Sequence, residues 1–201
     1  MHKFCNSLVN TIIKLKINDV NINALSLKER AKIISYIPTK LEVYDPYISV
    51  EAFVLLGRFP YKKSFFDYSD EDKKITQNTL EFLKIAHLKN HTIHSLSSGE
   101  QQLVLIATAL TQQSQIIIFD EPTANLDPHN SKIIAQHIKA LKERHKIILI
   151  THDLHLACFI DSPVLFIKDT KASLHEKEFF TDTKLEELYG VGFHSMAVVY
   201  D

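Results

Sequence analysis

The sequence predicts an α/β fold built on a parallel sheet. Three short runs, Ile116–Phe119, Ile147–Ile150 and Val164–Ile167, are wholly apolar, as expected of strands that are buried on both faces of a sheet. The segments between them carry apolar residues at helical spacing. Strands that alternate with helices along the chain imply right-handed crossovers and a layered α/β architecture.

The first half of the chain contributes further predicted elements. Ser26 with Glu29, and Ser69 with Asp72, have the spacing of a capping box, and each pair predicts the start of a helix. Up to residue 46 the predicted elements are a helix at 5–17, a turn at 18–23, a short helix at 27–32, a strand at 33–37 and a polar loop at 39–46. A helix at 50–56 that ends at Gly57 and an irregular aromatic-rich segment at 58–68 come next. The helix after Ser69 precedes a polar connector at 87–95, and its predicted apolar stripe is Ile75, Thr79, Phe82, Leu83 and Ala86.

The central segment, Leu96–Asp127, joins a capped helix to the strand Ile116–Phe119. Ser97 with Glu100 forms a third capping-box pattern, so a helix should begin at Ser98. The buried stripe of this helix is predicted at Leu103, Ile106, Ala107 and Leu110. Asp127 followed by Pro128 predicts the N-cap and the first residue of the next helix. In the last third, a helix at 153–160 and a short helix near 183–189 are predicted.

Composition excludes several classes of protein. The 201 residues, 45% hydrophobic and 23% charged, suit one globular domain. A net charge of −1 gives no basic footprint for nucleic acid, and two cysteines give neither a disulfide framework nor metal-binding spacing. No apolar run approaches the ~20 residues of a membrane-spanning helix, and the N-terminus is too weakly apolar for a signal peptide. The sequence therefore predicts a cytosolic protein.

Charged side chains follow two of the predicted strands. Asp120 and Glu121 come directly after Ile116–Phe119, and His152 lies just past Ile147–Ile150. Ligands of open parallel sheets bind beyond the carboxyl ends of the strands. An Asp there can hold Mg²⁺ through water, and a neighbouring Glu can polarise an attacking water. His152 could donate a hydrogen bond to a phosphate oxygen, although a strand-end carboxylate pair and a surface histidine are the simpler interpretations.

Ser97 and Gly99 lie at the predicted N-terminus of a helix, where free amides and the helix dipole favour an anion. Ser97 can equally act as an N-cap alone. Asp127 has the same two possibilities, because it is also the predicted N-cap of the helix that Pro128 begins.

The order of these motifs resembles the ATP-binding cassette (ABC) ATPases. LSSGE at Leu96–Glu100 is similar to the signature motif, IIIFD at Ile116–Asp120 to Walker B, and ANLD at Ala124–Asp127 to the D-loop. The resemblance covers roughly Ser26–Tyr189. It implies a P-loop NTPase-like sandwich with a parallel sheet core, in which a helical subdomain at about 46–110 is inserted within a single partial domain, residues 1–201. Relative to the family, this domain would lack the N-terminal hairpin and the phosphate loop.

The resemblance implies a role for each matched residue. Asp120 would hold Mg²⁺, Glu121 would be the catalytic glutamate, and His152 would be the switch histidine. The implied cofactors are ATP and Mg²⁺.

Three further residues would serve a partner subunit. Ser97 and Gly99 would touch the γ-phosphate of ATP held by the opposite subunit, and Asp127 would lie in the D-loop that crosses the dimer interface. The implied partners are a second ABC ATPase subunit and transmembrane permease subunits, with no nucleic acid. The chain would be cytoplasmic and peripheral on the inner face of the cell membrane.

The segment ISVEAFVLLGRFPY narrows the resemblance. Val50, Glu51, Gly57, Arg58 and Pro60 match a pattern that is typical of importers of iron–siderophore complexes, haem and cobalamin. In those importers the segment belongs to the helical subdomain and would face the permease. An amphipathic core helix followed by a loop is the alternative.

The sequence departs from the family at two places. The four glycines, Gly57, Gly99, Gly190 and Gly192, cannot compose a Gly-x-x-x-x-Gly-Lys-Ser/Thr phosphate loop (Walker A). Thr39 stands where the family has the Q-loop glutamine. Because the phosphate loop carries most of the binding of the β- and γ-phosphates, we expect this chain alone to bind ATP very weakly and not to hydrolyse it.

Two functions are compatible with these observations. The chain is either an ATP-hydrolysing importer subunit represented by an N-terminally truncated fragment, or a non-catalytic degenerate subunit or regulatory module that supplies its signature motif to an intact partner.

Overall fold

The computed structural model describes residues 16–17, 19–62, 67–176, 179–190 and 192. The helix predicted at 5–17 lies outside this part of the chain except for its last two residues. These form strand β1 (Lys16–Ile17), so the prediction is wrong there. β1 pairs antiparallel with β2 (Val20–Asn21), and the short 3₁₀ helix η1 (Ile22–Ala24) follows.

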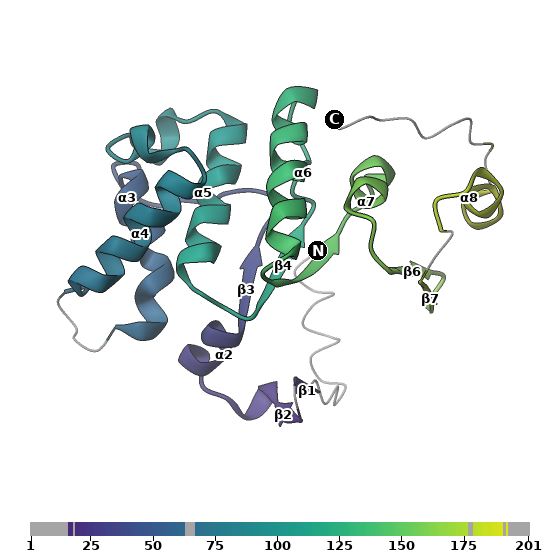
Figure 1. The fold of residues 1–201 in the computed structure, drawn as a ribbon, viewed down its shortest axis with the longest axis horizontal. Coiled ribbons are helices and arrows are strands. Elements are labelled where there is room, and N and C mark those ends of the chain that lie inside the picture. Colours follow the sequence, from purple (N-terminus) through teal and green to yellow (C-terminus); the bar gives the residue numbers. More distant parts are fainter. Residues whose placement is uncertain (1–15, 18, 63–66, 177–178, 191, 193–201) are drawn as a thin grey trace.

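A three-stranded parallel sheet lies at the centre of the molecule (Figure 1). Its strands are β3 (Ile34–Ile37), β4 (Ile116–Asp120) and β5 (Lys146–Ile150), in the order β3-β4-β5. β4 is the middle strand, and its Phe119 is fully buried. The predicted parallel sheet with flanking helices is therefore confirmed.

Helices cover one face of this sheet. They are α5 (Ser98–Thr111), α6 (Pro128–Lys142) and α7 (Leu154–Ile160), and their apolar residues share one core with Ile117 and Phe119. On the other face Tyr36, Ile148 and Ile150 are at least half exposed. Within the described residues the sheet is thus covered on one face only, which corrects the expectation that its apolar strands are buried on both.

A group of helices precedes the middle strand. It comprises α3 (Val50–Leu55), η2 (Leu56–Tyr61), α4 (Asp70–Phe82) and α5, which stand together on the left of Figure 1. Gly57 does not end a helix as predicted but lies buried within η2. A Cβ at this position would come within 2.3 Å of the Thr108 carbonyl oxygen, so glycine allows η2 to approach α5.

The inward face of α4 also differs from the prediction. Leu83 of the predicted stripe is buried, but the residues buried within α4 are Asp72, Thr76 and Leu80, whereas Phe82 is half exposed. The reason is a buried ion pair, because Arg58 Nε donates to Asp72 Oδ1 at 2.7 Å and turns that side of the helix inward. Apolar spacing alone cannot show that a charged side chain faces the core.

The remaining elements are short. The capping boxes predicted for α2 (Leu27–Ile33) and α4 are confirmed, and 3₁₀ turns η3 (Ala86–Leu88) and η4 (Ile93–Ser95) form the connector before α5. Among the helices that the structure describes, none has the length and apolarity needed to cross a bilayer.

The C-terminal strand is placed differently from the expectation of a third parallel strand. β6 (Val164–Lys168) pairs antiparallel with β7 (Lys171–His175), which was not predicted, and α8 (Asp182–Tyr189) follows. Asp169 and Thr170 both have positive φ, 48° and 64°. This is the backbone of a two-residue hairpin turn. The sequence Asp-Thr does not predict such a turn, because neither residue is glycine.

Candidate functional site

The first group of predicted site residues lies where β4 and β5 end. Asp120 is the last residue of β4, and Glu121 follows with φ of 49°. The Glu121 amide donates to the Ile150 carbonyl oxygen at 2.8 Å. The chain therefore turns sharply after Asp120 and brings the Glu121 side chain to the end of β5.

The Glu121 carboxylate is held by the two residues that follow β5. Its Oε1 accepts a hydrogen bond from the His152 amide at 2.9 Å and pairs with His152 Nδ1 at 2.7 Å. Its Oε2 accepts from the Thr151 hydroxyl at 3.1 Å. The hydrogen bond and the charge of Glu121 raise the pKa of His152, whose ring is largely exposed. The structure thus brings together Glu121 and His152, which are 31 positions apart.

Asp120 has a partner that the sequence analysis missed. The Tyr36 hydroxyl donates to Asp120 Oδ2 at 2.6 Å. Tyr36 pairs with Ile118 across the β3–β4 ladder, so it shares a face with Asp120 two residues further along β4. Only the strand register reveals this neighbour.

A polar chain behind Glu121 was also missed. The Asp153 amide donates to the Thr151 hydroxyl at 3.0 Å, and the buried Thr123 donates to Asp153 Oδ2 at 3.2 Å. Asp153 also caps α7. The turn after Glu121 is thereby tied to the start of α7. We call Tyr36, Asp120, Glu121, Thr151 and His152 the strand end.

The second group lies at the N-termini of α5 and α6. Ser97 is the N-cap of α5, and the predicted capping box with Glu100 is confirmed. Glu100 Oε2 accepts from both the amide and the hydroxyl of Ser97, at 2.8 Å and 2.7 Å, which lowers the pKa of Glu100. Ser97 is exposed, but Gly99 is buried.

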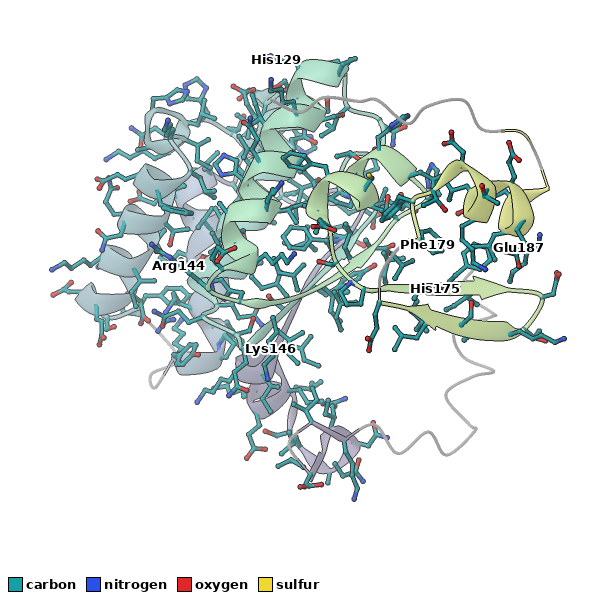
Figure 2. All side chains as sticks on the ribbon, turned by 45° about the vertical axis from the view of Figure 1, so that its right-hand side comes forward. His129, Arg144, Lys146, His175, Phe179 and Glu187 are labelled. Atoms are coloured by element: carbon teal, nitrogen blue, oxygen red, sulfur yellow. The ribbon has the colours of Figure 1, made fainter. Side chains whose placement is uncertain are left out.

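Asp127 is the N-cap of α6, as predicted. Its Oδ1 accepts from the amides of His129 and Asn130 at 2.9 Å and 3.1 Å, and its Oδ2 accepts from the Asn130 side-chain amide. These bonds from Asn130 and His129 hold the pKa of Asp127 below its ordinary value. Figure 2 labels His129 at this end of α6, with Arg144 and Lys146 beyond its opposite end. We call Ser97, Gly99, Asp127 and Asn130 the signature end.

The strand end can accommodate Mg²⁺ only together with a ligand that supplies further oxygens. Mg²⁺ usually takes one or two carboxylates, with water and substrate phosphates completing its octahedron. Asp120 offers one such carboxylate beside Glu121, and the described residues contain no group of three His, Cys, Asp or Glu that could hold a metal by themselves. The donor set therefore suits a Mg²⁺–nucleotide complex. Thr39 lies in the loop after β3.

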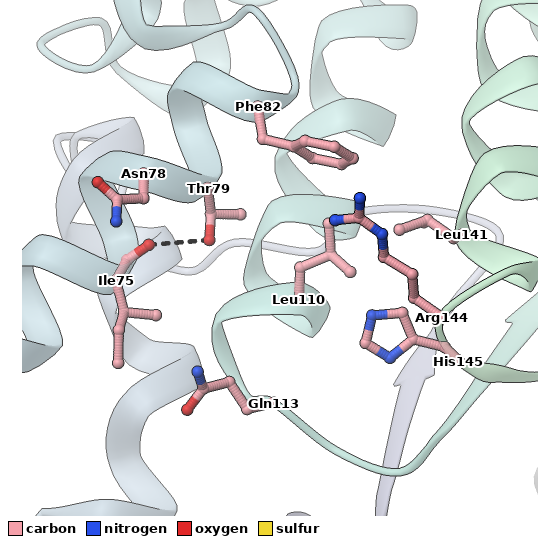
Figure 3. Close-up of a pocket in the computed structure, with 9 residues that line it drawn as sticks. All are labelled: Ile75, Asn78, Thr79, Phe82, Leu110, Gln113, Leu141, Arg144 and His145. Atoms are coloured by element: carbon pink, nitrogen blue, oxygen red, sulfur yellow. Dashed lines mark hydrogen bonds between the residues drawn. The ribbon is translucent and has the colours of Figure 1, made fainter.

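A cavity of about 380 Å³ lies away from both groups, between α4 and the C-terminal ends of α5 and α6 (Figure 3). It combines an apolar floor at Leu110 and Leu141 with polar side chains of Asn78, Gln113 and Arg144. Phe82 and Arg144, which also line it, are exposed, and the mixed lining indicates no particular ligand.

Comparisons with known proteins agree with this geometry. A family model described as "AAA domain, putative AbiEii toxin, Type IV TA system" matches residues 17–157. A Methanocaldococcus jannaschii protein described as an "Uncharacterized ABC transporter ATP-binding protein" is 34% identical over 191 residues, which cover 91% of this chain and 74% of that protein. A "Probable iron chelatin transport ATP-binding protein" of Helicobacter pylori is 32% identical over 196 residues, which cover 90% and 76%.

Solved structures share the fold. "An inward-facing conformation of a putative metal-chelate type ABC transporter" matches with a TM-score of 0.74 and 26% identity, over 80% of this chain and 64% of that one. A dimeric ATP-binding cassette in a post-hydrolysis state, bound to ADP and Pi, matches with a TM-score of 0.65 and 26% identity, over 80% and 71%. The predicted cassette fold is confirmed, and the chain belongs to the family of ABC transporter ATP-binding proteins.

Proposed function

We propose that the chain is the ATP-binding subunit of an ABC importer for a chelated metal of the iron–siderophore, haem or cobalamin type. The observation that carries the proposal is the pairing of Glu121 with His152 beside Asp120 at the carboxyl end of the sheet. The relative from Helicobacter pylori, whose name refers to iron chelatin transport, and the motif from Val50 to Pro60 support the class of cargo.

The strand end suits hydrolysis of a phosphoanhydride. Mg²⁺ bound with ATP neutralises charge on the phosphate oxygens. Asp120 would hold that ion, and Glu121 would accept a proton from the attacking water. His152 uses Nδ1 for Glu121, so its Nε2 is left to donate to a phosphate oxygen. Glu121 Oε1 accepts from the amide and Nδ1 of His152, whereas Oε2 accepts from the Thr151 hydroxyl. Oε2 therefore keeps a second lone pair that can accept a hydrogen bond from the water.

The partners in this proposal are a permease and a second ABC subunit. The region from about 46 to 110 would be the helical subdomain. Exposed Tyr47 and Phe59 belong to this region and exposed Tyr44 lies just before it, so all three are in or beside the segment that would face the permease. The chain would act at the inner face of the membrane. Ser97 and Gly99 would approach the nucleotide of the second subunit, with Asp127 at the interface.

A second candidate is a subunit that donates its signature motif but does not turn over ATP itself. The observation in its favour is that the signature end is fully assembled, whereas the 201 residues contain no phosphate-loop motif. Since electrostatic positioning of the phosphates supplies most of the catalysis in phosphoryl transfer, the chain by itself would bind ATP weakly and leave hydrolysis to its partner.

A chimera tests the first candidate. The residues before Ser26 are replaced by the corresponding N-terminal segment of the Helicobacter pylori relative, which is assayed in parallel. We expect the chimera to hydrolyse Mg²⁺–ATP, the chimera with Glu121→Gln to be inactive, and the unaltered chain to be inactive. Thr39→Gln in the chimera tests whether the hydroxyl at the Q-loop position limits the rate.

The second candidate predicts a different result. A folded chimera without ATPase activity, beside an active relative, contradicts the first candidate. The unaltered chain is then mixed with the Helicobacter pylori relative carrying a substitution of its own signature serine. Recovery of ATPase activity in that mixture, and its loss with Ser97→Arg, would support donation of the signature motif.

A further inference from the structure

The N-termini of α5 and α6 meet at Gly99 and Asn130. An ideal Cβ at Gly99 would lie 2.5 Å from both Cγ and Oδ1 of Asn130, and 3.0 Å from its Nδ2. The side-chain amide of Asn130 therefore lies directly against the Gly99 backbone. Gly99 is buried, while its neighbours Ser97 and Ser98 are exposed. A side chain of α6 therefore covers the signature glycine in this chain.

The same amide also holds the D-loop residue. Asn130 Nδ2 donates to Asp127 Oδ2, and the Asn130 backbone amide donates to Asp127 Oδ1 at 3.1 Å. One side chain consequently serves both parts of the signature end, because its Nδ2 is bonded to Asp127 and its amide occupies the space that a Cβ at Gly99 would need.

We propose that Asn130 is a positioning residue that couples Asp127 to the N-terminus of the signature helix α5. The functional consequence of this coupling rests on the proposed function, in which Asp127 and Ser97 both face the second subunit. The space between the Gly99 backbone and the Asn130 amide is too narrow for a methyl group, so a displacement of Asp127 is passed through Asn130 to the first turn of α5. The two partner-facing motifs then move as one unit.

The chemistry of asparagine suits this position. Aspartate would keep the shape but place a second negative charge beside Asp127. Leucine would lose the hydrogen bond to Asp127. Glutamine would add a methylene group where the Gly99 backbone already fills the space. An amide of this length is the side chain that satisfies both neighbours.

Amide hydrogen exchange of the isolated chain tests the coupling. The reporters are the amides of Glu100 and Gln101, which bond to Ser97 at the N-cap of α5. Asp127→Ser keeps a capping oxygen for α6 but removes the second carboxylate oxygen that holds Asn130. We expect it to accelerate exchange of both reporters by about tenfold, the effect of losing an interaction of cap strength. Asn130→Ala should accelerate them to a similar extent.

The double variant makes the test specific. If Asn130 transmits the effect, Asp127→Ser adds nothing further to Asn130→Ala. The matched control is Gln136→Ala, which removes an exposed amide from the same helix and should leave both reporters at the wild-type rate. Unchanged exchange in Asp127→Ser, or multiplied effects in the double variant, would overturn the proposal. Because no nucleotide or partner is present, these outcomes are independent of the ATPase assays above.

Discussion

The strand end and the signature end are assembled in different ways. At the signature end most hydrogen bonds are local, such as those between Ser97 and Glu100, three positions apart. At the strand end they join distant residues, because Tyr36 and Asp120 are 84 positions apart and Thr151 and Glu121 are 30 apart. A local motif forms wherever its helix begins, whereas the strand end exists only when three strands take their register.

The surroundings of the two ends also differ, in how deeply the neighbouring residues are buried. The signature end rests on helices whose core includes fully buried Val50, Val54 and Leu80. The strand end borders a sheet face on which Ile148 and Ile150 are each 50% exposed. Substitution of a residue that supports the helices should therefore lower the unfolding free energy more than substitution of a residue at the strand end.

The largest effect is expected for Arg58→Ala. Arg58 donates hydrogen bonds to Asp72 at 2.7 Å and to the carbonyl oxygen of Thr111, the last residue of α5, at 2.8 Å. Burial by itself raises the pKa of Asp72, but hydrogen bonds from Arg58 and Ser69 outweigh it and lower the pKa. Removal of one partner of a buried ion pair costs about 3–5 kcal/mol, measurable by urea unfolding.

Lys73→Ala is the matched control for Arg58→Ala. The pair between Lys73 and Asp70 is exposed, so its loss should change the unfolding free energy by about 0–1 kcal/mol. Equal losses of unfolding free energy in the two variants would contradict the prediction that the buried ion pair stabilises the fold more than the exposed one.

Gly99→Ala is expected to be second. A methyl group 2.5 Å from the Asn130 amide displaces that side chain from its rotamer and from its hydrogen bond to Asp127, at a cost of about 1–3 kcal/mol for overpacking. Combining it with Asn130→Ala removes the clash, so the double variant should unfold at a higher denaturant concentration than Gly99→Ala. Additive losses would show that the two side chains do not share this space.

Glu121→Gln should have a smaller and pH-dependent effect. Glu121 raises the pKa of His152 above its ordinary 6.5, so the pair contributes fully below pH 6.5 and its contribution disappears as the pH rises through the raised pKa. Because the His152 ring is 84% exposed, we expect at most about 1 kcal/mol. NMR titration should give His152 a lower pKa in the variant; an unchanged pKa would argue against the pair.

The smallest effect is expected for Tyr36→Phe. It removes the hydrogen bond to Asp120, and Tyr36 is 57% exposed, so water can replace the phenol as a donor. A typical hydrogen bond contributes about 0.5–1.5 kcal/mol. The loss of unfolding free energy in this variant, measured by urea unfolding, should lie at the lower limit of that range. A loss as large as that of Arg58→Ala would contradict the expected ranking of buried above exposed support.

The sequence alone predicted those features whose cause is local. The capping boxes at Ser26, Ser69 and Ser97 and the N-cap at Asp127 were all predicted from spacing and are present. The strand β4 followed by Asp120 was predicted from an uninterrupted apolar run. Each depends on side chains within a few residues of one another, so the order of residues is sufficient.

The elements that were predicted wrongly depend on contacts or backbone geometry that the spacing of apolar residues does not show. The inward face of α4 was misjudged because Asp72 is buried by Arg58, fourteen positions away. The antiparallel pairing of β6 with β7 depends on a turn in which Asp169 and Thr170 both have positive φ, a backbone that a β-branched residue such as threonine rarely adopts.

By itself the sequence determined the family, the order of the motifs and the identity of Asp120, Glu121 and His152 as candidates. Only the tertiary structure decided what those residues contact. Tyr36 and Thr151 reach the carboxylates because parallel register aligns the carboxyl ends of β3, β4 and β5. Asn130 reaches Gly99 because two helices pack closely enough to exclude a Cβ. Both arrangements follow from packing across the chain, which no local pattern of residues encodes.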